Sequence, residues 1–416
     1  MDVRQIRWFF KKMEPIRYGL YLVFTLLYVD YQIHSNVGLN ELILNTGSVI
    51  GFEGIIIEGS IRFFYRLFQS HSEDRTKLTE DYSALMYQYS RVQLIEYAGA
   101  IFPGEEIAFR THFSAPFQFE FNHNLKEKIY ELPEQIKNRS SELMKAHDCS
   151  TIYNQVTVRL EDCQQFGNAV KITYSRTTYY DLLITNRAMD YGLEKERWHT
   201  VKSVRQIYEP GPFLTPLSQS KLSNHLGFNG FVELADGYII FVLRNANVSV
   251  GKRRWNPSVS ASYKTQYGLD DERQMSEKHM GNAIRREIAD ELKIPVGKNE
   301  CLENCIFAFY RDLVEGGKPH FVFYYRLLDP KWTKAYFQAN FAHECLKRQA
   351  VHNRRRIRKM VKKRACFEFF SLEELKKGEL QAGGFLAPSG KLYKMQSDGT
   401  ISLALLLKHL ANDSTN

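Results

Sequence analysis

One stretch of the sequence, residues 281–294, constrains the fold more than any other. It reads G-N-A-I-R-R-E-I-A-D-E-L-K-I, and its apolar residues recur at the spacing of one helical face. Glu287, Asp290 and Glu291 follow at intervals of three and four residues, so a helix projects all three carboxylates from one side. Such like charges repel each other unless water, an arginine or a hard cation such as Mg²⁺ offsets the repulsion. On these residues alone, an ordinary solvated acidic face is the simpler interpretation.

The segments around this helix predict a mixed α and β arrangement. Two hairpins are expected, one around Ala235-Asp236-Gly237 and one around Glu315-Gly316-Gly317. A further strand leads into a helix start capped at Ser371. The predicted strands are 228–234, 238–244, 305–312, 320–328 and 367–370.

The run from Arg286 to Ile294 resembles the second half of a Nudix box, R-E-U-x-E-E-x-G-U. This resemblance implies a Nudix-like α/β/α sandwich, with Glu287, Asp290 and Glu291 as the Mg²⁺ ligands and the catalytic carboxylates of any hydrolase. The leading glycine of the box falls on Glu272, its first glutamate on Lys278 and its closing glycine on Lys293. Because the first half of the box is missing, we expect the fold without enzymatic activity.

Charge and cysteine usage limit the partners and the compartment. The chain has 416 residues with 56 Lys and Arg against 47 Asp and Glu, a net charge of +9. This excess suits an acidic partner such as a nucleotide, a nucleic acid or anionic lipid. The six cysteines are scattered without metal-type pairing, so the bulk of the chain is expected in a reducing cytosol.

Residues 1–70 predict a two-helix transmembrane hairpin. Two apolar runs, about 15–35 and 42–67, are joined by the polar turn 36–40, and Lys and Arg cluster at the outer ends only. This is the positive-inside pattern of a two-span inner-membrane protein with both termini in the cytoplasm. The ionisable residues within the spans would face a helix interface or a pore; they are Asp30, Glu53, Glu58 and Arg62. A helical hairpin without membrane insertion, serving dimerisation, is the alternative.

Composition divides the rest of the chain into three parts. Residues 71–103 are charged and helical in pattern and are expected to form a stalk. Residues 104–225 are interpreted as a strand-rich N-terminal elaboration of the same globular unit, and residues 226–412 as the Nudix-like domain. An insertion ends in two basic runs, 354–356 and 362–364, which predict either a solvated face or contact with lipid head groups or phosphates. The expected fold class is therefore α+β, a membrane hairpin plus a sandwich.

This combination is similar to anti-phage effectors of the cyclic-oligonucleotide system (CBASS) that join two transmembrane helices to a SMODS-associated Nudix domain. In motif the resemblance depends on residues 178–186 and 228–294. It implies a sensor that binds a cyclic di- or trinucleotide made by a partner nucleotidyltransferase. Binding would drive homo-oligomerisation and permeabilise the inner membrane, so lipids are expected partners and nucleic-acid polymers are not.

The same hypothesis predicts the ligand contacts. The pocket is expected over the sheet beside the box helix, with phosphate contacts from Arg244, Arg253, Arg254 and Arg311 and base stacking on Trp255 and Tyr310. Each of these residues also fits a structural role. Two alternatives remain open: a membrane-anchored, Mg²⁺-dependent Nudix pyrophosphohydrolase, and a Nudix-like protein that binds long nucleic acid.

Overall fold

A computed structural model describes most of the chain after residue 77. The described ranges are 78–110, 115–147, 153–193, 202–244, 248–347 and 367–413. By its contacts, the chain from Asp74 to Asn416 forms one compact unit. Residues 1–70, with Asp30, Glu53, Glu58 and Arg62, lie outside these ranges, as do the basic runs 354–356 and 362–364.

The predicted fold class and localisation need correction. Within the described ranges, no helix has the length and apolar character needed to cross a membrane. Among those helices, even α14 (Ser397–Asp413) has 17 residues and α11 (Lys334–Lys347) has 14, whereas a span needs about 20. The fold class with a transmembrane hairpin and the two-span inner-membrane localisation are therefore withdrawn. The described part is an α+β structure with mixed sheets.

A mixed nine-stranded sheet organises this unit. Its main path runs β1-β2-β10-β11-β6-β7-β12, with β8 paired to β7 and β9 to β6. Strands β6 and β11 are parallel neighbours, and the other pairs are antiparallel. The bounds are β1 Leu94–Tyr97, β2 Ala100–Phe109, β6 Gly227–Glu233, β7 Tyr238–Leu243, β8 Trp255–Asn256, β9 Val259–Ser262, β10 Ile306–Asp312, β11 Lys318–Arg326 and β12 Phe367–Ser371.

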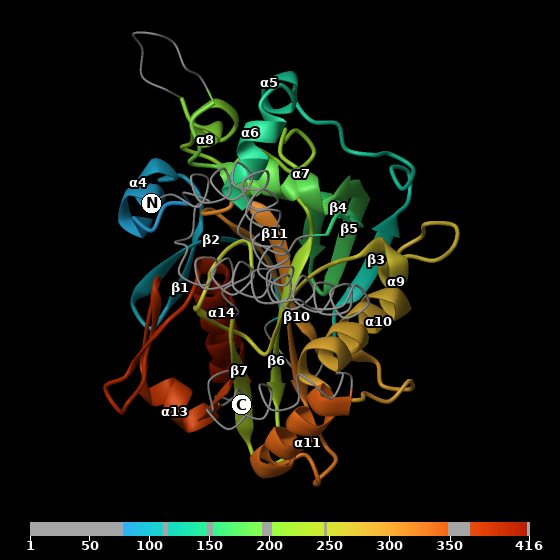
Figure 1. The fold of residues 1–416 in the computed structure, drawn as a ribbon, viewed down its shortest axis with the longest axis vertical. Helices are drawn as coiled ribbons and strands as arrows, with labels where there is room; N and C mark the ends of the chain where they lie inside the picture. The colour runs from blue at the N-terminus through green and yellow to red at the C-terminus, as the bar shows by residue number, and fades with distance from the viewer. Residues whose placement is uncertain are drawn as a thin grey trace, which may run out of the picture. The chain divides into compact units, whose positions relative to one another are not determined.

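Both faces of the sheet are buried by helices. Figure 1 shows α14 on one side of β6, β7 and β10, and α10 (Glu277–Glu287) on the other. Apolar residues of α10 share one core with Phe228 and Phe321, whereas those of α14 share a second core with Phe231 and Phe307. Alternate residues of β6 and β10 thus point into different cores, which explains why these strands are apolar throughout rather than alternating.

Two turns and one close contact fix the central strands. Gly237 in the β6–β7 hairpin has φ +83°, and Gly316 and Gly317 in the β10–β11 turn have φ +62° and +77°, values that L side chains rarely adopt. On β6, a Cβ at Gly230 would overlap the ring of Phe323 on the neighbouring β11. The glycine therefore lets the two parallel strands carry a large ring between them.

The region before β6 adds a small sheet and a group of short helices. Strands β3 (Gln118–Asn122), β5 (Ala169–Thr178) and β4 (Val156–Phe166) pair in that order. Figure 1 shows the short helices gathered at one end of the unit; they are α5 Glu134–Lys137, α6 Ser140–Met144, α7 Tyr179–Ile184 and α8 Val204–Tyr208. The predicted stalk region holds α4 (Tyr82–Gln88) followed by β1 and the start of β2.

The chain after β12 completes the sheet's second layer. Helix α13 (Leu372–Lys377) begins with a capping box in which Ser371 and Glu374 satisfy each other's backbone N–H groups. Three short strands follow, β13 (Glu379–Gln381), β14 (Gly384–Leu386) and β15 (Leu392–Lys394), before α14 packs on the sheet.

Candidate functional site: the box helix and two adjoining hollows

The box helix consists of α10 and a π-helical turn, η3 (Ile288–Leu292). It begins at Ser276, whose hydroxyl accepts a hydrogen bond from the backbone N–H of His279. Met280, Ala283, Ile284 and Ile288 are fully buried and fix the helix to the sheet. The helix ends at Lys293, which adopts a left-handed conformation with φ +60° and ψ 28°. This is the position where the Nudix box has a glycine, and its backbone conformation is one that glycine adopts without strain.

Glu287 is engaged by two side chains from the preceding segment. Lys264 Nζ lies 2.6 Å from Glu287 Oε1, and the hydroxyl of Tyr267 donates to the same oxygen. Helix α9 (Thr265–Gly268) presents Tyr267 to the box helix. Burial and the charge of Glu287 raise the pKa of the Tyr267 phenol, which keeps it a donor. The carboxylate therefore serves as a buried structural acceptor.

The other two predicted metal ligands are also occupied. Asp290 Oδ2 lies 2.9 Å from Arg286 Nε in an ion pair along the helix. Glu291 accepts a hydrogen bond of 3.4 Å from the backbone N–H of Ser260. Burial of its carboxyl group, together with the charge of Glu287, raises the pKa of Glu291 to about 8.

This arrangement does not fit a Mg²⁺ site. Magnesium requires several ionised oxygen ligands in near-octahedral geometry, whereas Glu287 is paired with Lys264 and the raised pKa of Glu291 disfavours its ionised form. In the part of the chain that the structure describes, no three His, Cys, Asp or Glu side chains are grouped so as to hold a metal ion. We therefore derive no metal-dependent step.

Tyr310 and Arg311, two of the predicted ligand contacts, are parts of the core on β10. Tyr310 is fully buried, stacks on His320 at 5.1 Å and places its hydroxyl 3.1 Å from Ser402 Oγ. Arg311 donates to the carbonyl of Thr215 at 2.7 Å and lies 3.2 Å from Glu105. Their contacts stabilise the sheet rather than a ligand.

The remaining predicted contacts lie around the β7–β8 connection. Backbone hydrogen bonds join Arg244 to Arg253 and Arg254, and the side chain of Arg254 pairs with Glu80. Trp255 packs edge-to-face on Tyr393 at 5.5 Å. Arg253 is exposed with φ +57°. The structure brings these four residues together, but neither they nor Tyr310 and Arg311 line the two hollows described next.

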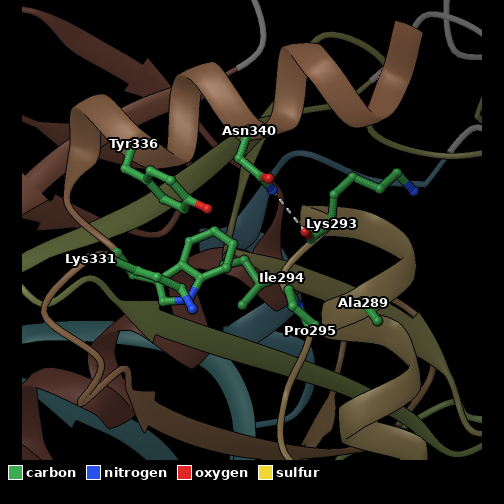
Figure 2. Close-up of a pocket in the computed structure, with 8 residues that line it drawn as sticks. Ala289, Lys293, Ile294, Pro295, Lys331, Tyr336 and Asn340 are labelled. Atoms are coloured by element: carbon green, nitrogen blue, oxygen red, sulfur yellow. Dashed lines mark hydrogen bonds between the residues drawn. The ribbon is translucent and has the colours of Figure 1, made fainter. Parts of the chain in front are cut away.

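Two hollows adjoin the box helix and meet at Ala289 and Pro295. The first, of about 350 Å³, lies between the end of the box helix and α11 (Figure 2). Figure 2 shows Tyr336 and Asn340 on α11 facing Ile294 across it, with the Tyr336 hydroxyl directed inward and the side chain of Lys293 directed away. Trp332 forms part of its wall and meets Tyr336 edge-to-face at 5.1 Å. The first hollow is thus an aromatic pocket with a polar rim.

The second hollow, of about 700 Å³, runs along the outer side of α10. Its wall includes Tyr267, Arg285, Arg286 and Lys298, together with the acidic pair Asp270 and Asp271. Arg285 donates to the carbonyls of Gly297 at 3.0 Å and Glu300 at 2.6 Å, and so holds the loop that presents Lys298. The Arg286–Asp290 pair is well exposed, so Arg286 can exchange that carboxylate for another anion at a cost below about 1 kcal/mol.

Sequence reasoning missed the aromatic wall of the first hollow. The spacing of Trp332, Tyr336 and Phe337 predicts a helix, but it does not show which of these rings is exposed. A tyrosine that is 42 % exposed next to a buried tryptophan is a surface feature that spacing alone does not reveal.

Comparison with known proteins finds no family model and no curated protein that matches this chain.

Proposed function

We propose that the described part of the chain is a nucleotide sensor, which binds a cyclic di- or trinucleotide made by a partner nucleotidyltransferase and leaves it intact. The observation that carries the proposal is the pair of adjoining hollows, walled by aromatic rings and cations, beside a box helix whose carboxylates are already engaged. Both hollows adjoin the box helix, and the residues that line them differ from those expected from the resemblance to the anti-phage Nudix effectors.

The chemistry of the two hollows suits the two parts of a nucleotide. In the first hollow a base can stack on the exposed ring of Tyr336, and base–aromatic stacking contributes about 1–3 kcal/mol. In the second, Arg286 and Lys298 offer charge for phosphates, and the planar guanidinium of Arg286 matches phosphate oxygens in pairs. Because the hollows meet at Ala289 and Pro295, one ligand with several bases and phosphates can occupy both.

Occupancy acts as a signal only if it changes the assembly or conformation of the chain. A ligand shifts such an equilibrium by no more than its difference in affinity between the two states. Under this proposal, homo-oligomerisation of the ligand-bound chain is the output that serves anti-phage defence.

The experiment uses the full chain and a panel of cyclic di- and trinucleotides and linear nucleoside diphosphate derivatives, with and without Mg²⁺. Thermal unfolding and the integrity of the nucleotide are recorded on the same samples. We expect one cyclic nucleotide to raise the unfolding midpoint, to remain uncleaved and to act equally without Mg²⁺. Mg²⁺-dependent loss of a diphosphate substrate would instead show a Nudix hydrolase and overturn the proposal.

A matched pair of variants then locates the site. Tyr336→Ala should weaken binding of the active nucleotide about 5- to 160-fold, the loss of one stacked base. Tyr87→Ala removes a tyrosine that is 85 % exposed on α4 and lines neither hollow, so it should bind as the parent does. Equal affinity of both variants would remove the first hollow from the proposal.

A further inference from the structure

A second group of polar side chains lies at the opposite end of the central strands. The first hollow lies beyond the end of β11, whereas this group surrounds the point where β6 and β11 begin. Arg187 comes from η2 (Asn186–Ala188), which begins at the last of the residues 178–186 noted in the sequence. Glu315 comes from the β10–β11 turn, Lys318 and His320 from β11, and His225 from the residues just before β6.

Two buried cations in this cluster share one carboxylate. Arg187 Nε lies 3.3 Å from Glu315 Oε1, and Lys318 Nζ lies 3.1 Å from Glu315 Oε2. The exposed fractions of the three side chains are 11 % for Arg187, 8 % for Glu315 and 5 % for Lys318. An uncompensated buried charge costs several kcal/mol, so this environment favours an additional anion.

The neighbouring groups leave the balance positive. Arg244 adds a third cation that acts on Glu315, and Asp398 adds a half-buried carboxylate that acts on Arg187. Asp312 adds little negative charge at neutral pH, because burial and the charge of Glu315 raise its pKa to about 8.

The two histidines supply buried nitrogens without partners. Lys318 Nζ lies 3.0 Å from His320 Nε2, and an ammonium can only donate, so Nε2 accepts and Nδ1 carries the hydrogen. Among the described residues, neither His320 Nδ1 nor His225 Nε2 has a hydrogen-bond partner. Burial and the charges of Lys318 and Arg187 hold the pKa of both imidazoles well below the usual range. A bound anion near these imidazoles would raise the pKa of both.

Two hydroxyl groups add directed donors. Arg187 Nη1 donates to Tyr179 Oη at 2.9 Å and to Ser249 Oγ at 2.6 Å. The two hydroxyl oxygens are 3.2 Å apart, so at most one hydroxyl donates to the other. The other hydroxyl hydrogen remains available to an acceptor. Although burial of the phenol opposes it, the charge of Arg187 and the hydrogen bond with Ser249 lower the pKa of Tyr179.

We propose that this cluster binds one phosphate group, with Arg187 and Lys318 supplying the charge and Tyr179 and Ser249 the directed hydrogen bonds. The excess of donors and of positive charge is what a phosphate oxyanion complements. The group is either free phosphate or a phosphate of a nucleotide. The site is separate from the nucleotide hollows, so a test of phosphate binding here is independent of a test of the function proposed above.

The test measures thermal unfolding of the full chain in inorganic phosphate, adenosine 5′-monophosphate and a cyclic dinucleotide, each against chloride at equal ionic strength. We expect phosphate to raise the midpoint of the parent protein. Tyr179→Phe removes one hydroxyl and keeps the ring that packs on His225. It should weaken the apparent phosphate affinity about tenfold or more, and Lys318→Gln should abolish the shift.

Lys264→Gln provides the matched control, because it removes a partly buried, paired lysine next to the box helix. It should keep the full phosphate shift. A shift that is equal in all variants would reveal a non-specific salt effect and overturn the proposal, as would the absence of any shift. If Lys318→Gln does not fold, the phosphate shift of Tyr179→Phe relative to the parent is the deciding measurement. A shift with the nucleotides that Tyr179→Phe also reduces would assign a nucleotide phosphate, and a shift with phosphate alone would assign the free ion.

Discussion

Replacing Glu287 by glutamine separates a structural carboxylate from a metal ligand. The structure pairs this carboxylate with Lys264 at 2.6 Å and with the Tyr267 hydroxyl, at a position that is 4 % exposed. The amide introduced by Glu287→Gln keeps an acceptor for Tyr267 but leaves the ammonium of Lys264 without its counter-charge. The variant is therefore expected to be less stable even without any metal.

The cost follows from the burial of the two partners. Breaking a fully buried ion pair by removing one partner costs about 3–5 kcal/mol, whereas exposed pairs contribute about 0–1 kcal/mol. The side chain of Lys264 is 26 % exposed, so water relieves part of the penalty. We expect a loss of about 2 kcal/mol for Glu287→Gln, between these two limits. Asp290→Asn breaks an exposed pair and should cost less than about 0.5 kcal/mol.

Urea unfolding at several pH values is the assay. Glu291 has a raised pKa of about 8 in the folded state, so its neutral form favours folding fully below its unfolded pKa, and this stability is lost as the pH rises to about 8. Removing the charge of Glu287 lowers the pKa of Glu291. In Glu287→Gln the pH-dependent loss of stability due to ionisation of Glu291 therefore ends at a lower pH and is smaller in total. The deficit of Glu287→Gln should therefore be smaller at about pH 9 than at about pH 6.

A specific effect of Mg²⁺ would refute this reasoning. If Mg²⁺ stabilises the parent but not Glu287→Gln, and the two are equally stable without it, the carboxylate is a metal ligand. A double-mutant cycle with Lys264→Met completes the test, since a structural pair requires a coupling of about 1 kcal/mol or more between the two sites.

Three further predictions address stability and are checked by urea unfolding. Lys293→Gly should stabilise the chain by about 0.5 kcal/mol, because glycine adopts the left-handed conformation at φ +60° without strain; Lys293→Ala should not. Gly230→Ala should destabilise it by about 1–3 kcal/mol or more, because the added methyl overlaps the ring of Phe323, and a variant as stable as the parent would contradict the packing. The stability of Asp312→Asn relative to the parent should increase as the pH rises from about 4 to about 8, and should stay constant above that. The reason is that the pKa of the buried Asp312 carboxyl is about 8, so the parent loses the stabilising neutral form over this window. A stability difference that is constant from about pH 4 to about pH 8 would show that the pKa of Asp312 is ordinary.

Local pattern predicted the central strands and the box helix well. The strands expected at 228–234 and 238–244 are β6 and β7, and those expected around Gly316 and Gly317 are β10 and β11. Their signals are turn residues and apolar runs, which depend on neighbours in the sequence. The same holds for the capped start of α13 at Ser371.

The site residues could not be predicted in the same way. Tyr310 and Arg311 carry suitable side chains, yet they lie on a strand that helices cover on both faces, and sequence does not show that burial. The carboxylate of Glu287 resembles a metal ligand until Lys264 and Tyr267 are seen to contact it. The aromatic wall around Tyr336 exists only because α11 lies against the end of the box helix.

The pairing of β2 with β10 decides how far the chain can be shortened. Phe109 pairs with Ala308, so the early segment covers a strand whose seven residues are all buried. A protein that started at residue 226 would contain every element that resembles a Nudix domain, yet it would present β10 as an open apolar edge. Open edges of this kind pair with other chains and aggregate. Recombinant production of the described unit therefore needs β1 and β2, and a start near residue 74 preserves the whole compact unit.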